Sequence, residues 1–371
     1  MKHGIVYRAD GGMFPYCGWP TVCADENGTL YAAFSGNRAA HVCPFGKDLM
    51  CVSHDGGESW TAPMIINDTQ LDDRDAGIVS LGDGKLLMSF FNHPRRFYTE
   101  RRKTGKIFKH PMSDLAMAMT NGLFDEWEKI DESVEAEGVD RSGSYTRLSR
   151  DGGKTWEKAV QAPVTAPHGP IMLSDGSLLY FGKRMTEVND SSFRITAAKS
   201  LDMGKSWEIL GEVPLPEGYS WDQLFEPHAV ELPSGRILGA IRAHVDSSRF
   251  ASGITILLTH SDDGGKTWST PFETEICGTP PHLLLHSSGA VILSYGRREV
   301  PYGERAMISY DGGESFTKEV VLDDMGPDWD LGYPSTAELS DGSLITVYYQ
   351  KVQGDSYCSV LYTKWELPEN S

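Results

Sequence analysis

One octapeptide occurs five times along this chain and limits the possible folds more than any other feature. Its pattern is Ser-x-Asp-x-Gly-x-Ser/Thr-aromatic. The five copies are SHDGGESW (residues 53–60), SRDGGKTW (149–156), SLDMGKSW (200–207), SDDGGKTW (261–268) and SYDGGESF (309–316). Such a segment predicts a hairpin turn, because Asp accepts backbone hydrogen bonds, Gly adopts positive φ and the aromatic ring packs beneath the turn. Five equivalent turns cannot all form one active site, so we interpret them as structural.

A second repeat consists of a hydrophobic strand, a glycine-containing turn and another hydrophobic strand. The six turn glycines are Gly28, Gly84, Gly176, Gly235, Gly289 and Gly342, and each of the first five is followed by one octapeptide. One four-stranded unit per roughly 50 residues is typical of a β-propeller. We therefore predict an all-β fold in which residues 1–371 form a single six-bladed propeller of antiparallel blades.

Two parts of the chain depart from this repeat. The sixth unit lacks the octapeptide, and the N-terminal strand GIVYRA is available to supply its fourth strand and close the ring. The second unit carries an insertion at about residues 93–147, basic in its first half and acidic in its second. We expect these halves to pair with each other; the alternatives are a flap at the rim or a contact between subunits of a homo-oligomer.

Charge and composition exclude several classes of protein. With 34 Lys and Arg against 52 Asp and Glu, the net charge is -18, which argues against binding to nucleic acid or to an anionic membrane. No apolar run has the length of a membrane helix, and no signal-peptide core is visible, so we expect a cytoplasmic protein. Six cysteines without a CxxC pair predict free thiols. His41 and Cys43 alone are a weak metal signal, so we expect no metal and no cofactor.

The repeat register places particular side chains at one edge of the propeller. Because paired strands run antiparallel, the start of the strand before each turn and the end of the strand after it lie at the same edge. Nine residues before a turn glycine stand Trp19, Asp75, Glu226 and Tyr333, and Arg74 stands one residue earlier than Asp75. Seven residues before a turn glycine stand His228 and His282. Seven to ten residues after a turn glycine stand Arg38, Arg184, Arg242, Arg297 and Arg298. Arginines from four blades at one edge of an acidic protein predict a site for an anionic ligand, since the guanidinium binds carboxylates bidentately. Each histidine has a plain structural role as its alternative.

These residues resemble the sialidase superfamily over nearly the whole chain. The octapeptides match the family's Asp boxes, FEPHAVELPSGRILGAIR resembles its Glu-strand-Arg segment, and GYPSTAELSDGSLITVYY resembles its tyrosine segment. The resemblance implies that Tyr333 is the nucleophile and Glu226 its base. It also implies that Arg242, with Arg297, Arg298 or Arg305, binds the carboxylate of the sugar. A neutral tyrosine suits a sugar whose anomeric carbon carries a carboxylate, which would repel a carboxylate nucleophile.

The sequence departs from that family pattern in two places. Gly18-Trp19-Pro20 stands where the family has Arg-Ile-Pro, so we expect Arg38 or Arg74 to substitute for the missing arginine. The family's acid/base Asp is also absent after Arg38, which leaves His41, Asp48 and Asp75 as candidates for proton transfer.

Together with the predicted anion site, the resemblance implies an exo-acting glycoside hydrolase that removes a terminal acidic sugar, first of all sialic acid, from a glycan or oligosaccharide without a metal. The alternatives are a glycosidase or lyase of the same superfamily acting on another acidic sugar, and a non-catalytic glycan-binding propeller.

Overall fold

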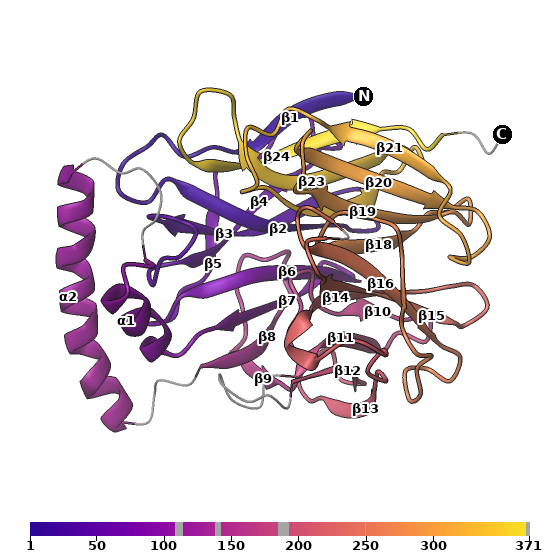
Figure 1. Cartoon of the computed structure of the whole chain (residues 1–371), viewed down its shortest axis with the longest axis horizontal. Helices are drawn as coiled ribbons and strands as arrows, with labels where there is room; N and C mark the ends of the chain where they lie inside the picture. Colours follow the sequence, from indigo (N-terminus) through magenta and orange to yellow (C-terminus); the bar gives the residue numbers. More distant parts are fainter. Residues whose placement is uncertain (108–113, 138–141, 185–192, 249, 369–371) are drawn as a thin grey trace.

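The computed structural model describes residues 1–107, 114–137, 142–184, 193–248 and 250–368. The described residues form six four-stranded antiparallel sheets, arranged as the blades of a propeller. First strands of neighbouring blades contact one another around most of the ring, so these strands surround the central channel. Figure 1 shows the blades following one another in chain order around the ring. The predicted six-bladed, all-β fold is confirmed.

The blades are built from consecutive strands. Blade 1 is β2 (Tyr16–Ala24), β3 (Leu30–Arg38), β4 (Lys47–Ser53) and β5 (Met64–Asn67); blade 2 is β6 (Asp73–Gly82), β7 (Lys85–Asn92), β8 (Gly143–Ser149) and β9 (Val160–Ala162). Blade 3 is β10 (Ile171–Met172), β11 (Leu178–Arg184), β12 (Arg194–Ser200) and β13 (Glu208–Glu212); blade 4 is β14 (Leu224–Glu231), β15 (Ile237–His244), β16 (Ile254–Ser261) and β17 (Phe272–Glu273), preceded by the short 3-10 helix η1 (Trp221–Gln223). Blade 5 is β18 (Pro281–Leu285), β19 (Val291–Arg297), β20 (Gly303–Ser309) and β21 (Lys318–Asp323). Blade 6 is β22 (Gly332–Glu338), β23 (Leu344–Lys351), β24 (Cys358–Trp365) and β1 (Lys2–Tyr7).

The N-terminal strand closes the ring. Strand β1 pairs antiparallel with β24, with Lys2 opposite Lys364 and Ile5 opposite Leu361. The two strands lie side by side in Figure 1, close to both chain ends. This pairing between the two ends of the chain supplies the fourth strand that the sixth blade lacks, as the sequence predicts.

The octapeptides form the expected hydrogen-bonded turns. In the fourth copy, the Ser261 hydroxyl donates to Asp263 and accepts from the Gly265 amide at 2.8 Å, while Asp263 accepts from the Thr267 amide at 2.9 Å. The ring of Trp268 then stacks on Phe181 of the preceding blade, with 4.3 Å between ring centroids. The same serine hydroxyl accepts from a glycine amide in all five copies, and the aromatic ring of each copy packs against an apolar cluster.

The insertion in blade 2 folds as two helices, α1 (Arg95–Lys103) and α2 (Asp114–Glu137), beside blades 1 and 2 in Figure 1. Arg102 of α1 pairs with Asp125 and Glu128 of α2 at 2.6 and 3.0 Å, so the basic and acidic halves do contact each other. Tyr98 of α1 is fully buried and donates a hydrogen bond to Asp72 of the propeller. Within the described residues, no helix is long and apolar enough to cross a membrane.

Four first strands share an unusual backbone feature at equivalent positions. Trp19, Asp75, Glu226 and Tyr333 have φ values of 55°, 54°, 45° and 52°, a region that side chains other than glycine seldom occupy. A β-bulge interrupts the strand pairing at each of them. Bulges redirect side chains and are frequent beside active sites, so the repeat itself turns these four residues toward one end of the channel.

Candidate active site

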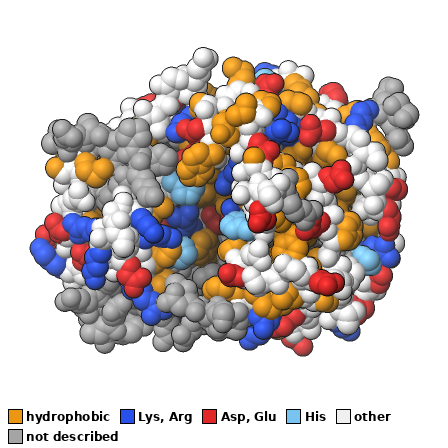
Figure 2. Space-filling model, viewed as in Figure 1, with side chains coloured by type: hydrophobic (Ala, Val, Ile, Leu, Met, Phe, Trp, Pro, Cys, Tyr) orange, Lys and Arg blue, Asp and Glu red, His pale blue; other side chains and the backbone are white. Residues whose placement is uncertain are grey.

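A cavity of about 480 Å³ opens at the edge of the propeller where these bulges lie. Its size is that of a small-molecule site. It is lined by His41, Arg74, Asp75, Phe91, His93, Thr165, Ala166, Pro167, Lys183, Phe193, Phe225, Glu226, Arg242, Arg298, Trp329 and Tyr333. Figure 2 shows histidine and basic side chains around a hollow near the centre of the displayed face. The cavity therefore collects residues from all parts of the chain at the predicted edge.

Three residues from blades 4 and 6 form a hydrogen-bonded chain in this cavity. The Tyr333 hydroxyl donates to Oε1 of Glu226 at 2.6 Å, and Arg242 donates to Oε2 of the same carboxylate, also at 2.6 Å. Glu226 lies on β14 and Arg242 on the paired strand β15, whereas Tyr333 reaches across the channel from β22. The sequence predicts all three residues for the site, and the fold brings them together.

The protonation states of this chain follow from burial and charge. Burial raises the pKa of Tyr333 well above 10, and the nearby charges of Glu226 and Asp75 raise it further. Burial alone would raise the pKa of Glu226, but the charge of Arg242 and hydrogen bonds from Tyr333 and Arg242 hold it below its usual value. At neutral pH the phenol is thus protonated while its partner is an ionised acceptor, the arrangement of a nucleophile with a general base.

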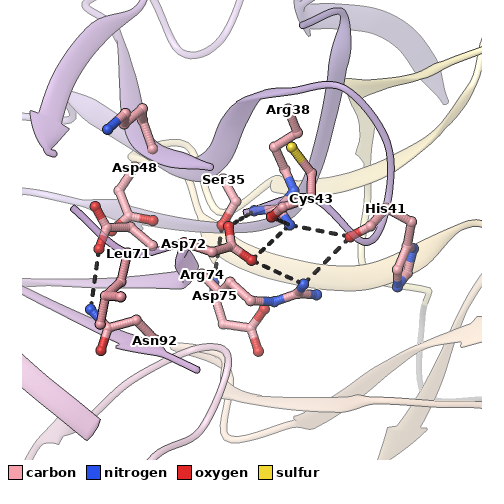
Figure 3. Close-up of polar contacts among 12 residues, drawn as sticks. Ser35, Arg38, His41, Cys43, Asp48, Leu71, Asp72, Arg74, Asp75 and Asn92 are labelled. Atoms are coloured by element: carbon pink, nitrogen blue, oxygen red, sulfur yellow. Dashed lines mark hydrogen bonds and ion pairs between the residues drawn. The ribbon is translucent and has the colours of Figure 1, made fainter. Parts of the chain in front are cut away.

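Arg74 and Asp75 bring charge to the cavity from blade 2. Burial raises the pKa of Asp75 to about 7, although Arg74 acts in the opposite direction. Its backbone amide donates to Ser35 at 3.0 Å, and its Oδ1 is buried without a partner among the described residues. Arg74 contacts Asp72 at 3.4 Å and the backbone oxygen of His41 (Figure 3). Asp75 therefore offers a titratable group to a ligand, and Arg74 is held close to it.

Two further cations line the cavity from blades 3 and 5. Arg298 lies with its guanidinium carbon 5.8 Å from the ring centroid of Tyr333 and donates to the Leu331 carbonyl. Lys183 lies over the ring of Phe225 at 3.7 Å, and burial lowers the pKa of its ammonium to about 8. The Nε atoms of Arg242 and Arg298 are buried without partners among the described residues. These groups make the cavity cationic and leave hydrogen-bond donors for an anion.

Trp19 forms the layer beneath these charged groups. It is 1% exposed, and the guanidinium groups of Arg74 and Arg38 lie 4.1 and 4.7 Å from its ring. Its ring also packs edge-on against His41 at 5.0 Å and Tyr333 at 6.4 Å. Trp19 thus supports the residues that line the cavity and does not itself belong to the lining.

Several residues that the sequence predicts for the site do not reach this cavity. Arg38 is fully buried and pairs with Asp72, and its Nη2 donates a hydrogen bond of 3.0 Å to Oδ2 of Asp72 (Figure 3). Arg297 lines a separate cavity beside Cys277. Arg305 donates to the carbonyls of Glu304 and Asp323. Asp48 lies buried beside Asn67 at 3.3 Å. None of these four side chains lines the cavity, because each is directed to another part of the fold.

His228 and His282 are also misplaced by the sequence prediction. They lie in the central channel with His168, where the rings of His228 and His282 stack at 4.4 Å. All three line a different cavity, which also includes the turn-proximal residues Glu231 and Glu338. Burial lowers the pKa of each histidine, that of His228 to about 3. His228 stands two residues beyond the bulged residue Glu226, and therefore lies further along the channel than the cavity described above.

Sequence reasoning missed Lys183, although the repeat register contains the signal. Lys183 stands seven residues after its turn glycine, as Arg242 does, whereas Arg184 stands eight after it. Because side chains alternate along a strand, a shift of one residue points Arg184 away, and it lies 3.7 Å from Glu212. The same alternation directs Arg298 into the cavity and its neighbour Arg297 into a separate one.

The described residues contain no cluster of three His, Cys, Asp or Glu side chains arranged to hold a metal ion. All six cysteines are free thiols, and four of them are buried. The cavity itself presents a phenol, carboxylates, imidazoles and cationic groups.

The chain belongs to the family described as BNR repeat-like domain, whose sequence profile matches residues 108–346. It is thus a member of that family with a six-bladed propeller fold. A comparison with curated protein sequences finds no match.

Several solved structures share the fold. A protein of unknown function from Dyadobacter fermentans superposes with a TM-score of 0.76 at 21% identity, covering 99% of this chain and 98% of that one. The NanB sialidase of Streptococcus pneumoniae has a TM-score of 0.67 at 15% identity, covering 98% of this chain and 70% of that one. An intramolecular trans-sialidase from Ruminococcus gnavus has a TM-score of 0.62 at 14% identity, covering 98% and 97%. At these identities the likeness shows the fold, and it agrees with the resemblance drawn from the sequence motifs.

Proposed function

We propose that this protein is an exo-acting glycoside hydrolase that removes a terminal acidic sugar, with sialic acid as the first candidate. The observation that carries the proposal is the hydrogen bond of 2.6 Å between Tyr333 and Glu226 inside a cationic cavity. A buried phenol paired with an ionised carboxylate has little value for simple binding, but it is an activated nucleophile for covalent catalysis.

The substrate class follows from charge. Arg74, Arg242 and Arg298, together with Lys183, outnumber the two carboxylates that face the cavity, Glu226 and Asp75. The unpartnered Nε groups of Arg242 and Arg298 favour a planar anion such as a carboxylate. A sugar with its carboxylate at the anomeric carbon would place that anion beside Tyr333, which lies under Arg298. A neutral nucleophile avoids charge repulsion there.

In the proposed reaction, Tyr333 attacks the anomeric carbon while Glu226 takes the phenolic proton. The product of this step is a glycosyl–tyrosine, which water then hydrolyses, so the sugar is released with its anomeric configuration retained. A second group must protonate the leaving oxygen and later deprotonate water. His41 and Asp75 both line the cavity and remain the candidates for this proton transfer.

A panel of aryl glycosides tests the proposal. It contains α-sialosides, uronides and neutral sugars, each offered to the wild type and to Tyr333→Phe. We expect release from an acidic glycoside and its loss in Tyr333→Phe, because the variant keeps the ring but has no nucleophile. Release from uronides alone would keep the hydrolase and change the sugar. No release across the panel, combined with binding of an acidic sugar that Tyr333→Phe preserves, would favour a glycan-binding propeller.

A further inference from the structure

His41 is hydrogen-bonded to a buried carboxylate that lies far away in the sequence. Its Nδ1 is 3.0 Å from Oδ1 of Asp330, and the Asp330 residue is only 2% exposed. The His41 side chain is 26% exposed and lines the cavity. The pair therefore joins the loop after β3 to the segment just before β22, the strand that carries Tyr333.

The surroundings hold both members of this pair in place. The hydroxyls of Tyr16 and Tyr349 donate to the same Asp330 oxygen at 2.9 and 3.3 Å. The Tyr16 oxygen also lies 2.9 Å from Nδ1 of His41. The backbone carbonyl of His41 accepts from Arg38 at 3.2 Å and from Arg74 at 3.4 Å. A loop residue with its ring and its backbone both anchored has the fixed orientation that proton transfer requires.

The hydrogen bond determines which ring nitrogen serves the cavity. An ionised carboxylate only accepts hydrogen bonds, so Nδ1 of His41 donates to Asp330. The neutral imidazole then has its lone pair on Nε2, the nitrogen not bound to Asp330. Trp19 packs edge-on against the His41 ring on one side, and Trp329 lies 6.2 Å from its centroid. The ring is thus enclosed by aromatic groups, with Nε2 as its reactive atom.

The charged groups around His41 act on its pKa in opposite directions. Burial lowers the pKa of His41, the hydrogen bond and charge of Asp330 raise it, and Arg74 and Arg298 lower it again. The net result is a pKa below the usual value of about 6.5. Asp330 is therefore the group that opposes the lowering of this pKa and favours the imidazolium.

We propose that His41 is the acid/base residue of the reaction and that Asp330 is its positioning residue. This inference rests on the proposed hydrolase function and selects His41 over Asp75 for proton transfer. Asp75, with its unpartnered Oδ1, then binds a polar group of the substrate.

The proton balance of the cycle is closed. In the first step, the Tyr333 oxygen bonds to the anomeric carbon, Glu226 takes the phenolic proton, and the bond to the leaving oxygen breaks as the His41 imidazolium protonates that oxygen from Nε2. In the second step, neutral His41 takes a proton from water, and the water oxygen bonds to the anomeric carbon. The bond to Tyr333 breaks, and Glu226 returns the proton to the phenolate. One water is consumed, and every group regains its starting state.

The pH dependence of kcat/KM tests the role of His41. The first step needs protonated His41, so kcat/KM falls as pH rises through its pKa, which lies below 6.5 in the free enzyme. If Asp75 were the acid, the fall would centre near pH 7. Asp330→Asn removes the charge that stabilises the imidazolium. We therefore expect the fall of kcat/KM with rising pH to occur at a pH about one unit lower in this variant.

Leaving groups provide the second readout. An aryl glycoside with an acidic phenol leaves without much protonation, whereas an alkyl glycoside needs it. We expect His41→Gln to lower kcat/KM for the alkyl glycoside by roughly 10²–10⁴-fold and for the activated aryl glycoside far less. This variant also serves if Asp330→Asn does not fold.

Asp328→Asn is the matched control, because it removes a nearby carboxylate that pairs with Lys351 and keeps an oxygen that can accept from the Asp330 backbone amide. We expect kcat/KM of this control variant to fall at the same pH as that of the wild type. If His41→Gln lowered kcat/KM equally for the aryl and the alkyl glycoside, the proton-transfer role alone would be overturned. The same holds if the pH at which kcat/KM falls were unchanged in Asp330→Asn. A wild type without turnover on any acidic glycoside would overturn the hydrolase function and this role together.

Discussion

The Tyr333 hydroxyl donates a hydrogen bond of 2.6 Å to Glu226, although the two residues are separated by 107 positions in the chain. Each occupies the bulged position of a first strand, nine residues before the turn glycine of its blade. The propeller therefore brings the pair together through its repeat, because equivalent positions of different blades converge at one end of the channel. Arg242, on the strand paired with that of Glu226, completes the chain and keeps the carboxylate ionised.

Glu226→Gln is predicted to reduce kcat by roughly 10²–10⁴-fold with a small change in KM. The amide keeps the size of the side chain and its place beside Tyr333, but it cannot take the phenolic proton. Steady-state kinetics on the active aryl glycoside measures the loss. Glu231→Gln is the control, because Glu231 ends the same strand and bonds to Ser174 near the turns. A Glu226→Gln protein with wild-type kcat would contradict the role of Glu226 as a base.

Arg298→Ala is predicted to raise KM for an acidic sugar by roughly 10–100-fold, the effect of losing a hydrogen bond between charged groups. The methyl ester of the same substrate lacks the anion, so the variant and the wild type should process it with similar KM. Arg297→Ala is the matched control, since the neighbouring arginine faces a separate cavity. Equal effects of the two substitutions would show that the cavity does not select the carboxylate through Arg298.

Asp75→Asn is predicted to change how stability depends on pH. Burial raises the pKa of Asp75 to about 7 in the folded protein, while the unfolded chain titrates near 4. Between these values the folded state binds more protons, so the wild type loses stability as pH rises from about 4 to 7. The asparagine variant lacks this contribution and should gain relative to the wild type at pH 8 but not at pH 4. Urea unfolding at both values measures it, and a constant difference would contradict the raised pKa.

Arg38→Met is predicted to destabilise the fold by about 3–5 kcal/mol, because it leaves the buried Asp72 carboxylate without its main partner. The double variant Arg38→Met/Asp72→Asn removes both charges and should lose less. Urea midpoints of the wild type, the two single variants and the double variant form the thermodynamic cycle. An unchanged midpoint for Arg38→Met, together with a raised KM, would instead return Arg38 to the ligand site.

The fold and the Tyr333–Glu226–Arg242 chain were predictable from sequence because they depend on the repeat. Turn glycines and octapeptides establish the blade register, and that register places equivalent residues at one edge. The insertion was harder to interpret, since its charges indicate that its halves pair but not that Tyr98 is inserted against Asp72.

The errors in the site have two physical causes. Side chains alternate along a strand, so residues an odd number of positions after the turn glycine face the cavity and residues an even number after it do not. Arg184 and Arg297 each stand eight positions after their turn glycine and therefore point away from the cavity. Arg38 follows a different rule: its charge is neutralised by Asp72, which precedes β6 of the next blade, and such a pair between blades leaves no pattern in a single strand. Asp330 was missed for the same reason, because its partner His41 lies 289 positions away.

Trapping the covalent intermediate is the most direct test of Tyr333 as the nucleophile. A substrate analogue with fluorine beside the anomeric carbon and a good leaving group should accumulate as a glycosyl–enzyme, and peptide mass spectrometry then locates the sugar. We predict one added sugar on Tyr333, absent in Tyr333→Phe and formed more slowly in Glu226→Gln. A sugar on another residue, or turnover of the parent substrate with inversion of the anomeric configuration, would contradict it.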